Sequence, residues 1–195
     1  EEIILLEGMV GNLLQNNKQQ VFDGYKKISK ISSDSIRLFE HTVEHIVQND
    51  FCFQKQYDLL RLYQRIENIS GFILAAANRL NIFCSINAVM PEACYAGINS
   101  LTENIVAIHK EFQNAMNKYQ KNKKHVLDII HKVEEKEQEA DKIRVDFLQV
   151  IYNLANQNKV KLGDLRAIEN IIDLLEEVTD KINEAATSLE WLLIQ

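Results

Sequence analysis

The chain has 195 residues and a formal net charge of −6, and 46% of its residues are hydrophobic. The negative charge argues against non-specific nucleic-acid binding, which depends on Lys and Arg side chains that neutralise phosphates. One proline and six glycines are too few for the corners of a turn-rich β fold, so the composition favours a few long helices with short connections.

Apolar residues recur at steps of three and four along almost the whole chain, which is typical of amphipathic helices. Helix-breaking residues divide the sequence into six predicted helices, at about 1–16, 19–48, 54–83, 91–119, 121–156 and 162–194. Helices of this length joined by short turns are expected to pack side by side as antiparallel bundles. The sequence therefore predicts an all-α fold.

The second predicted helix carries a pair of histidines, His41 and His45, one turn apart. This spacing can chelate a transition metal. Histidine pairs on helix surfaces are more often solvated, however, and we favour that interpretation.

The cysteines Cys52, Cys84 and Cys94 are far apart and form no C-x-x-C motif. Three cysteines do not suggest a disulfide framework, so a reducing, cytoplasmic compartment is expected. No apolar run approaches the roughly 18 to 20 residues of a membrane span. The sequence begins at Glu1 without a methionine, which leaves open a lost upstream segment, a membrane segment included.

A basic run covers residues 118–125 and includes Lys121, Lys123 and Lys124. We interpret it as a solvated helix end, although it would also suit an acidic partner or an anionic membrane surface. Any association with a membrane is therefore expected to be peripheral at most.

The last predicted helix has the strictest apolar stripe. Its members alternate by three and four residues from Leu165 to Leu193, which predicts one buried face about eight turns long. Trp191, together with Leu189 and Leu192, is expected to belong to the same core.

Acidic residues of the last two predicted helices also follow the helical repeat. Steps of three and four connect Glu134, Glu137 and Asp141 on one helix, and Glu169, Asp173, Glu176 and Asp180 on the next. If the two helices are antiparallel neighbours, the two rows converge, and like charges repel unless something positive lies between them. A hard cation with oxygen ligands would supply that charge, as would Lys or Arg side chains of a partner. The simpler interpretation is a solvated face, balanced by Lys132, Lys136, Lys142 and Arg144.

The two halves of the sequence resemble each other. Residues 34–37 match residues 141–144 at an offset of 107, while 66–69 match 175–178 and 76–80 match 185–189 at an offset of 109. The conserved order and nearly constant offset indicate an internal duplication with a small length change in one turn. We predict two three-helix bundles, residues 1–88 and 89–195, packed as one compact unit with a junction near Pro91.

Two motifs of the second half resemble those of a known family. Residues 137–141 (EQEAD) and 176–180 (EEVTD) are similar to the paired E-x-x-x-D motifs of PhoU and its relatives. In that family one motif lies on the second helix and one on the third helix of a three-helix repeat. The resemblance covers nearly the whole chain and is greatest to the short PhoU-like proteins associated with low-affinity phosphate transporters. E-x-x-x-D alone is common in helices, so its specificity comes from order, spacing and duplication.

The resemblance implies a non-enzymatic regulator that contacts a phosphate transporter or a phosphate-sensing kinase. It also implies a divalent or ferric metal ion, for which the candidate ligands are Glu137, Asp141, Glu176 and Asp180. Such an ion would tune the shape or the oligomeric state of the protein, which is compatible with a homo-oligomer.

The first half departs from the family motif. It has Lys30 and Asp34 in one pair and Glu67 and Gly71 in the other, so each pair has lost one carboxylate. A lysine ammonium group would also repel a cation. No metal cluster is therefore expected in the first half.

Three other functions remain as alternatives. The chain would be a cytosolic domain of a sodium–phosphate cotransporter if several apolar spans preceded it. It would be a carboxylate-metal enzyme or iron-storage bundle if it bound stoichiometric iron, although the ferritin-like Glu-x-x-His motif is absent and Asp128 with His131 is the nearest approach. The third alternative is a scaffold without a ligand. A phosphate-binding Gly-x-x-x-x-Gly-Lys loop is absent as well.

Overall fold

The computed structural model describes residues 1–49, 51–120 and 123–194. In these ranges it contains α-helices and one 3-10 turn, without strands. The helices are α1 (Glu2–Leu14), α2 (Lys18–Gln48), α3 (Phe53–Ser85), α4 (Tyr95–Lys118), α5 (Lys123–Asn156) and α6 (Leu162–Ile194), and the turn η1 (Glu92–Cys94) precedes α4. The predicted all-α class is confirmed, and the predicted helices are present with ends within four residues. Within the described ranges, none of these helices combines the length and apolar character needed to span a bilayer.

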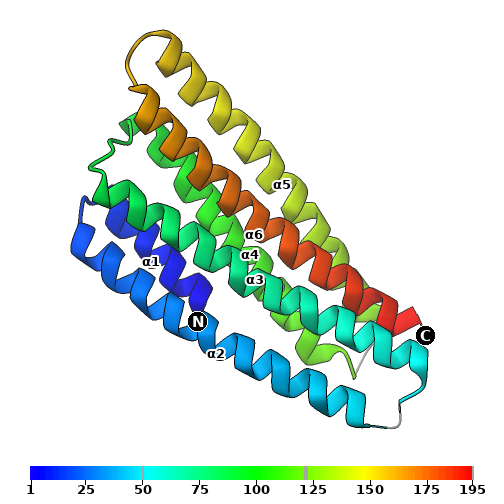
Figure 1. The fold of residues 1–195 in the computed structure, drawn as a ribbon. Helices are drawn as coiled ribbons and strands as arrows, with labels where there is room; N and C mark the ends of the chain where they lie inside the picture. Colours follow the sequence, from blue (N-terminus) through cyan, green and yellow to red (C-terminus); the bar gives the residue numbers. More distant parts are fainter. Residues whose placement is uncertain (50, 121–122, 195) are drawn as a thin grey trace.

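Successive helices run antiparallel and form two groups of three, α1–α3 and α4–α6 (Figure 1). The two groups pack against each other mainly through α3 and α6, and α1 also lies against α4. The predicted boundary at residues 88 and 89 falls in the connection between α3 and η1.

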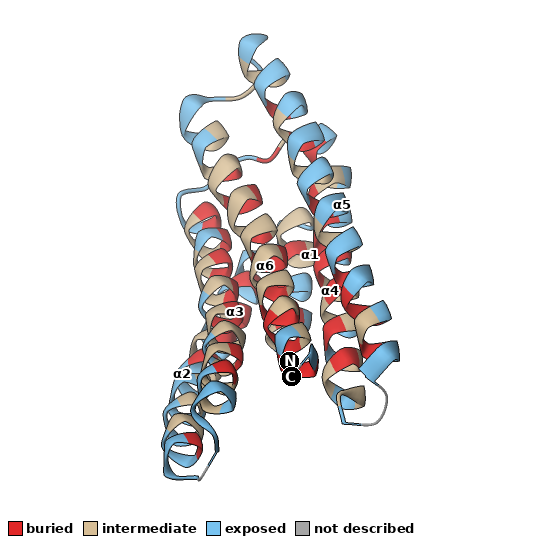
Figure 2. Cartoon of the chain, turned by 90° about the vertical axis from the view of Figure 1, so that its right-hand side faces the viewer, coloured by how far each residue is buried: buried red, intermediate tan, exposed pale blue. Residues whose placement is uncertain are grey.

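The core is centred on α6, which packs against α3, α4 and α5. Its predicted stripe is buried from Ile168 onward, and further residues of α6, such as Ile171 and Val178, are buried as well (Figure 2). Close approach of α3 and α6 is possible because small side chains lie on both helices. These residues are Ala76, Ala77, Ala185 and Ala186, each 0% exposed.

One prediction about the core is wrong. Leu189 and Leu192 are buried, but Trp191 is 46% exposed. Its ring stacks on the guanidinium of Arg61 of α3, 4.2 Å from the ring centroid. Position 191 lies two residues after Leu189, on the opposite side of the helix. The indole therefore lies on the surface, against Arg61, instead of entering the core.

Three helices end in the same way, at an asparagine with positive φ. Asn16, Asn87 and Asn158 follow α1, α3 and α5, with φ angles of 57°, 55° and 56°. After α5, the N–H of Asn158 donates to the carbonyl of Ala155 and that of Lys159 to the carbonyl of Leu154, both at 2.9 Å. This pair of hydrogen bonds is the Schellman motif, whose left-handed residue is usually glycine and sometimes asparagine.

Replacing Asn158 with alanine is expected to lower the free energy of unfolding by about 1 kcal/mol, because alanine is strained at positive φ. Asn158→Gly should preserve or raise it, since glycine adopts this conformation without strain. Urea denaturation followed by circular dichroism measures both effects, with Gln157→Ala at the neighbouring exposed position as the control. Equal losses in Asn158→Ala and Gln157→Ala would contradict the explanation.

Candidate functional site

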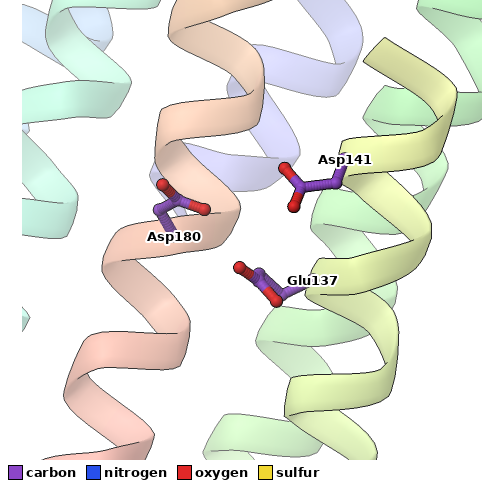
Figure 3. A group of neighbouring side chains, drawn as sticks. All are labelled: Glu137, Asp141 and Asp180. Carbon is purple, nitrogen blue, oxygen red and sulfur yellow. The ribbon is translucent and has the colours of Figure 1, made fainter. Parts of the chain in front are cut away.

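The acidic rows of α5 and α6 meet where these two helices pack against each other. Glu137 and Asp141 of α5 and Asp180 of α6 point toward one another (Figure 3). One carboxylate oxygen from each residue lies within 4.8 Å of the other two. Glu137 and Asp180 are half-buried and Asp141 is exposed, so the cluster is reachable from solvent.

A second group adjoins the first and consists of Glu176, Glu177 and Asp180, again with one oxygen of each within 4.8 Å of the others. Asp180 belongs to both groups. The structure thus brings the four residues predicted from the motifs into one region. Glu176 neighbours Asp180 and Asp141 there, but it does not belong to the group that contains Glu137. Glu177 was not predicted as a ligand. Its position three residues before Asp180 is the sequence signal that would have identified it.

The arrangement follows from the spacing of the motifs. Residues four apart lie on the same helix face, and antiparallel packing pairs the first residue of one motif with the last of the other. Glu137 therefore lies beside Asp180, and Asp141 beside Glu176, each pair close enough for a carboxyl–carboxylate hydrogen bond.

Partial burial and neighbouring acidic groups raise the pKa values of Glu137, Glu176 and Asp180. For Glu176, burial and a hydrogen bond with Asp141 raise the pKa to about 8, against the opposing charge of Arg144. Burial, followed by the charges of Asp141 and Asp180, raises the pKa of Glu137. Burial and the charge of Glu177 raise the pKa of Asp180. Each of these three carboxyl groups therefore binds a proton more readily than it would in water, and a nearby positive charge would oppose this effect.

Basic side chains form ion pairs with several acidic residues of α6. Arg144 binds Asp173 through Nε and Nη2, both at 2.8 Å, and lies 3.8 Å from Glu176. Lys181 Nζ lies 2.7 Å from Glu184 and 3.7 Å from Glu177.

The predicted balance by basic residues is therefore only partly present. Within the described ranges, no Lys or Arg nitrogen comes within 4.0 Å of a carboxylate oxygen of Glu137, Asp141 or Asp180. Of the four basic residues expected to balance the acidic face, Arg144 contacts it, whereas Lys132, Lys136 and Lys142 form no ion pair with described residues.

The donor atoms of the first group suit a hard cation. Ca²⁺, Mg²⁺, Mn²⁺ and Fe³⁺ prefer carboxylate oxygens, and neither group contains the histidine or thiolate that softer ions favour. Lys181 places a positive charge beside Glu177 and so opposes an ion in the second group. Glu137, Asp141 and Asp180 are therefore the better candidate ligands, with Glu176 next to them.

The other predicted site residues lie apart from this cluster. His41 and His45 are exposed, and His45 Nδ1 lies 3.1 Å from Asn49 Nδ2. Neither histidine belongs to a group of three potential ligands among the described residues. In the basic run, Lys123 donates to the carbonyl of Leu193 at 3.0 Å, whereas Lys121 lies outside the described residues.

The equivalent positions of the first half also differ from the cluster. Lys30 is exposed, Asp34 lies 3.6 Å from Arg37, and Gln64 donates to Glu67 at 3.4 Å. Both groups of potential metal ligands among the described residues belong to the second half.

Two solved structures from Shewanella oneidensis MR-1 have the same fold. One is a PhoU-like protein, with a TM-score of 0.85 and 14% sequence identity over 99% of this chain and 92% of the other. The second is described as a PhoU-like phosphate regulatory protein, with a TM-score of 0.83 and the same identity and coverage. No protein-family model and no curated protein matches the sequence. The PhoU-like fold expected from the sequence resemblance is thus confirmed.

Proposed function

We propose that the protein regulates inorganic phosphate transport by binding a protein partner, either a phosphate transporter or a phosphate-sensing kinase. The fold supports this proposal, because it is shared along almost the whole chain with a protein described as a phosphate regulatory protein. The observation that carries the proposal is the convergence of Glu137, Asp141 and Asp180, with no Lys or Arg of the described residues in an ion pair with them. We place the protein in the cytoplasm and assign it no catalytic activity.

In this proposal the carboxylates of Glu137, Asp141 and Asp180 would hold a hard cation, which would place a positive charge between them. Without added charge, these side chains repel one another across the contact between α5 and α6. With the charge balanced, the same side chains hold the two helices together. Cation occupancy is therefore coupled to the shape of the second half, and through it to partner binding or oligomeric state.

The partner is tested by co-expression with the phosphate transporters of the source organism. The tagged protein is expected to co-purify with one of them from detergent-solubilised membranes and to change its phosphate uptake in whole cells. A sulfate transporter of similar abundance is the control. Absence of co-purification and unchanged phosphate uptake, for every phosphate transporter and sensor kinase tested, would contradict the proposal.

An iron enzyme or iron-storage protein is the alternative that the oxygen-rich cluster favours. That function requires stoichiometric iron in the purified protein and oxidation of Fe²⁺ that is abolished in Glu137→Ala. Elemental analysis with an oxygen-consumption assay distinguishes the two functions, because a regulatory cation site has no turnover.

A further inference from the structure

A cavity of about 260 Å³ lies at the end of the bundle where α1 turns into α2 and where α3 ends. α1 and α3 are followed there by Asn16 and Asn87, whose positive φ angles turn the chain away from each helix. Figure 1 shows the two turns side by side, and Lys18 Nζ donates to Asn87 Oδ1 between them at 2.7 Å. The cavity adjoins both turns, since Asn16, Lys18 and Ala88 line it.

The residues that line the cavity lie within 13–18 and 83–95, and the structure describes all of them. α1 runs from Glu2 toward the cavity, so its first residue lies at the other end of that helix. α6 ends beside the first part of α3, where Trp191 stacks on Arg61, whereas the cavity lies at the last part of α3. The cavity is thus defined by residues that lie away from both ends of the chain.

The wall of the cavity is mainly apolar. Phe83, Cys84 and Met90 are buried, and the remaining apolar residues of the wall are Leu13, Leu14, Ala88, Val89 and Tyr95. An apolar cavity of about 150 Å³ is large enough to bind benzene, so this larger one suits a chain of roughly eight carbon atoms. Burial of such a chain would be driven by the hydrophobic effect.

The charge at the cavity favours an anion. Lys18 is the one charged residue in its lining, within the described part of the chain, and its exposed side chain places the ammonium group near solvent. An ammonium group has three N–H donors, so Lys18 can bind a carboxylate while it keeps its hydrogen bond to Asn87. Inorganic phosphate is a poor match, because a doubly charged ion needs more donors than one lysine among apolar side chains.

We propose that this cavity binds a small amphipathic monocarboxylate, with its carboxylate paired to Lys18 and its apolar tail against Phe83 and Met90. The cavity shares no residue with the two carboxylate groups of α5 and α6. Binding of this ligand and binding of a cation can therefore fail independently of each other.

The probes are hexanoate, octanoate and dodecanoate, each added below its micelle concentration to the isotope-labelled protein. Two-dimensional NMR is expected to show saturable shifts of the amide signals of Cys84, Ala88 and Met90 with octanoate. Octanoate should bind about tenfold more tightly than hexanoate, because it buries two further methylene groups. Dodecanoate should bind no more tightly than octanoate, since its tail exceeds the cavity.

A charge variant tests the role of Lys18. Lys18→Gln should weaken octanoate binding about fivefold, because it removes the charge that pairs with the carboxylate. Binding of octanol, which has the same tail without the charge, should be unchanged. Lys30→Gln is the matched control, since Lys30 is exposed on the same helix and does not line the cavity.

A second variant tests the position of the tail. Ala88→Phe fills the cavity and should abolish binding of both octanoate and octanol. Ala96→Phe is its control, because Ala96 is exposed and lies outside the lining. Circular dichroism verifies that the variants fold.

Four results would overturn the proposal. The first is the absence of saturable shifts with octanoate. The second is equal weakening of octanoate and octanol in Lys18→Gln, which would show that the charge is not recognised. The third is tighter binding of dodecanoate with shifts spread over the surface, which would indicate non-specific adsorption. The fourth is the same set of shifts with inorganic phosphate, which would indicate an anion site without a place for a tail.

Discussion

Saturating Mn²⁺ is expected to raise the midpoint of thermal unfolding by about 5 to 10 °C at pH 7.5. A ligand present at 100 times its dissociation constant stabilises the folded state by about 2.7 kcal/mol. In a protein of this size, each kcal/mol shifts the midpoint by roughly 2 to 4 °C. The cation acts by balancing the charges of Glu137, Asp141 and Asp180, which otherwise repel one another. Differential scanning fluorimetry after treatment with EDTA, with Mg²⁺, Ca²⁺ and Fe³⁺ compared in parallel, measures the shift.

Asp180→Asn should abolish most of this response, because Asp180 belongs to both carboxylate groups. Glu139→Gln is the matched control, since Glu139 lies on α5 between Glu137 and Asp141 but is exposed and belongs to neither group. The control should respond to the cation as the unmodified protein does. An equal response in Asp180→Asn would place the cation elsewhere, and no response of the unmodified protein to any of the four cations would eliminate the cation site.

The fold was predictable because the spacing of apolar residues within each helix indicates which face of that helix is buried. The three-four repeat from Leu165 to Leu193 fixes the buried face of α6, and the helix-breaking residues fix the ends. The convergence of the two acidic motifs was predictable for a related reason. Once α5 and α6 are antiparallel neighbours, a four-residue spacing on each helix brings Glu137 close to Asp180 and Asp141 close to Glu176.

The details of the site depend on contacts across helices, which single-helix patterns do not contain. Lys136 and Arg144 both looked able to balance the acidic face, but only Arg144 reaches Asp173, because its position on α5 matches the register of α6.

Raising the pH from about 5 to about 8 is expected to destabilise the cation-free protein by roughly 2 to 4 kcal/mol. The folded-state pKa of Glu176 is about 8, compared with an ordinary value of 4.5. A carboxyl group with a raised folded-state pKa binds its proton more tightly in the folded protein. Its stabilising contribution is therefore complete below pH 4.5 and is lost as the pH rises through 8. Glu137 and Asp180, whose pKa values are also raised, act in the same direction.

Urea denaturation in EDTA at several pH values between 5 and 8 measures this slope. Glu176→Gln should flatten it, because the neutral amide resembles the protonated carboxyl group and does not titrate, whereas Glu139→Gln should leave it unchanged. The same slope in Glu176→Gln as in the unmodified protein would show that another group binds the proton. Protons and cations compete for the same carboxylates, so Mn²⁺ should stabilise the protein more at pH 8 than at pH 5. Stabilisation by Mn²⁺ that increases with pH would indicate a cation site. A cluster that only shares protons would instead lose stability at high pH, with or without Mn²⁺.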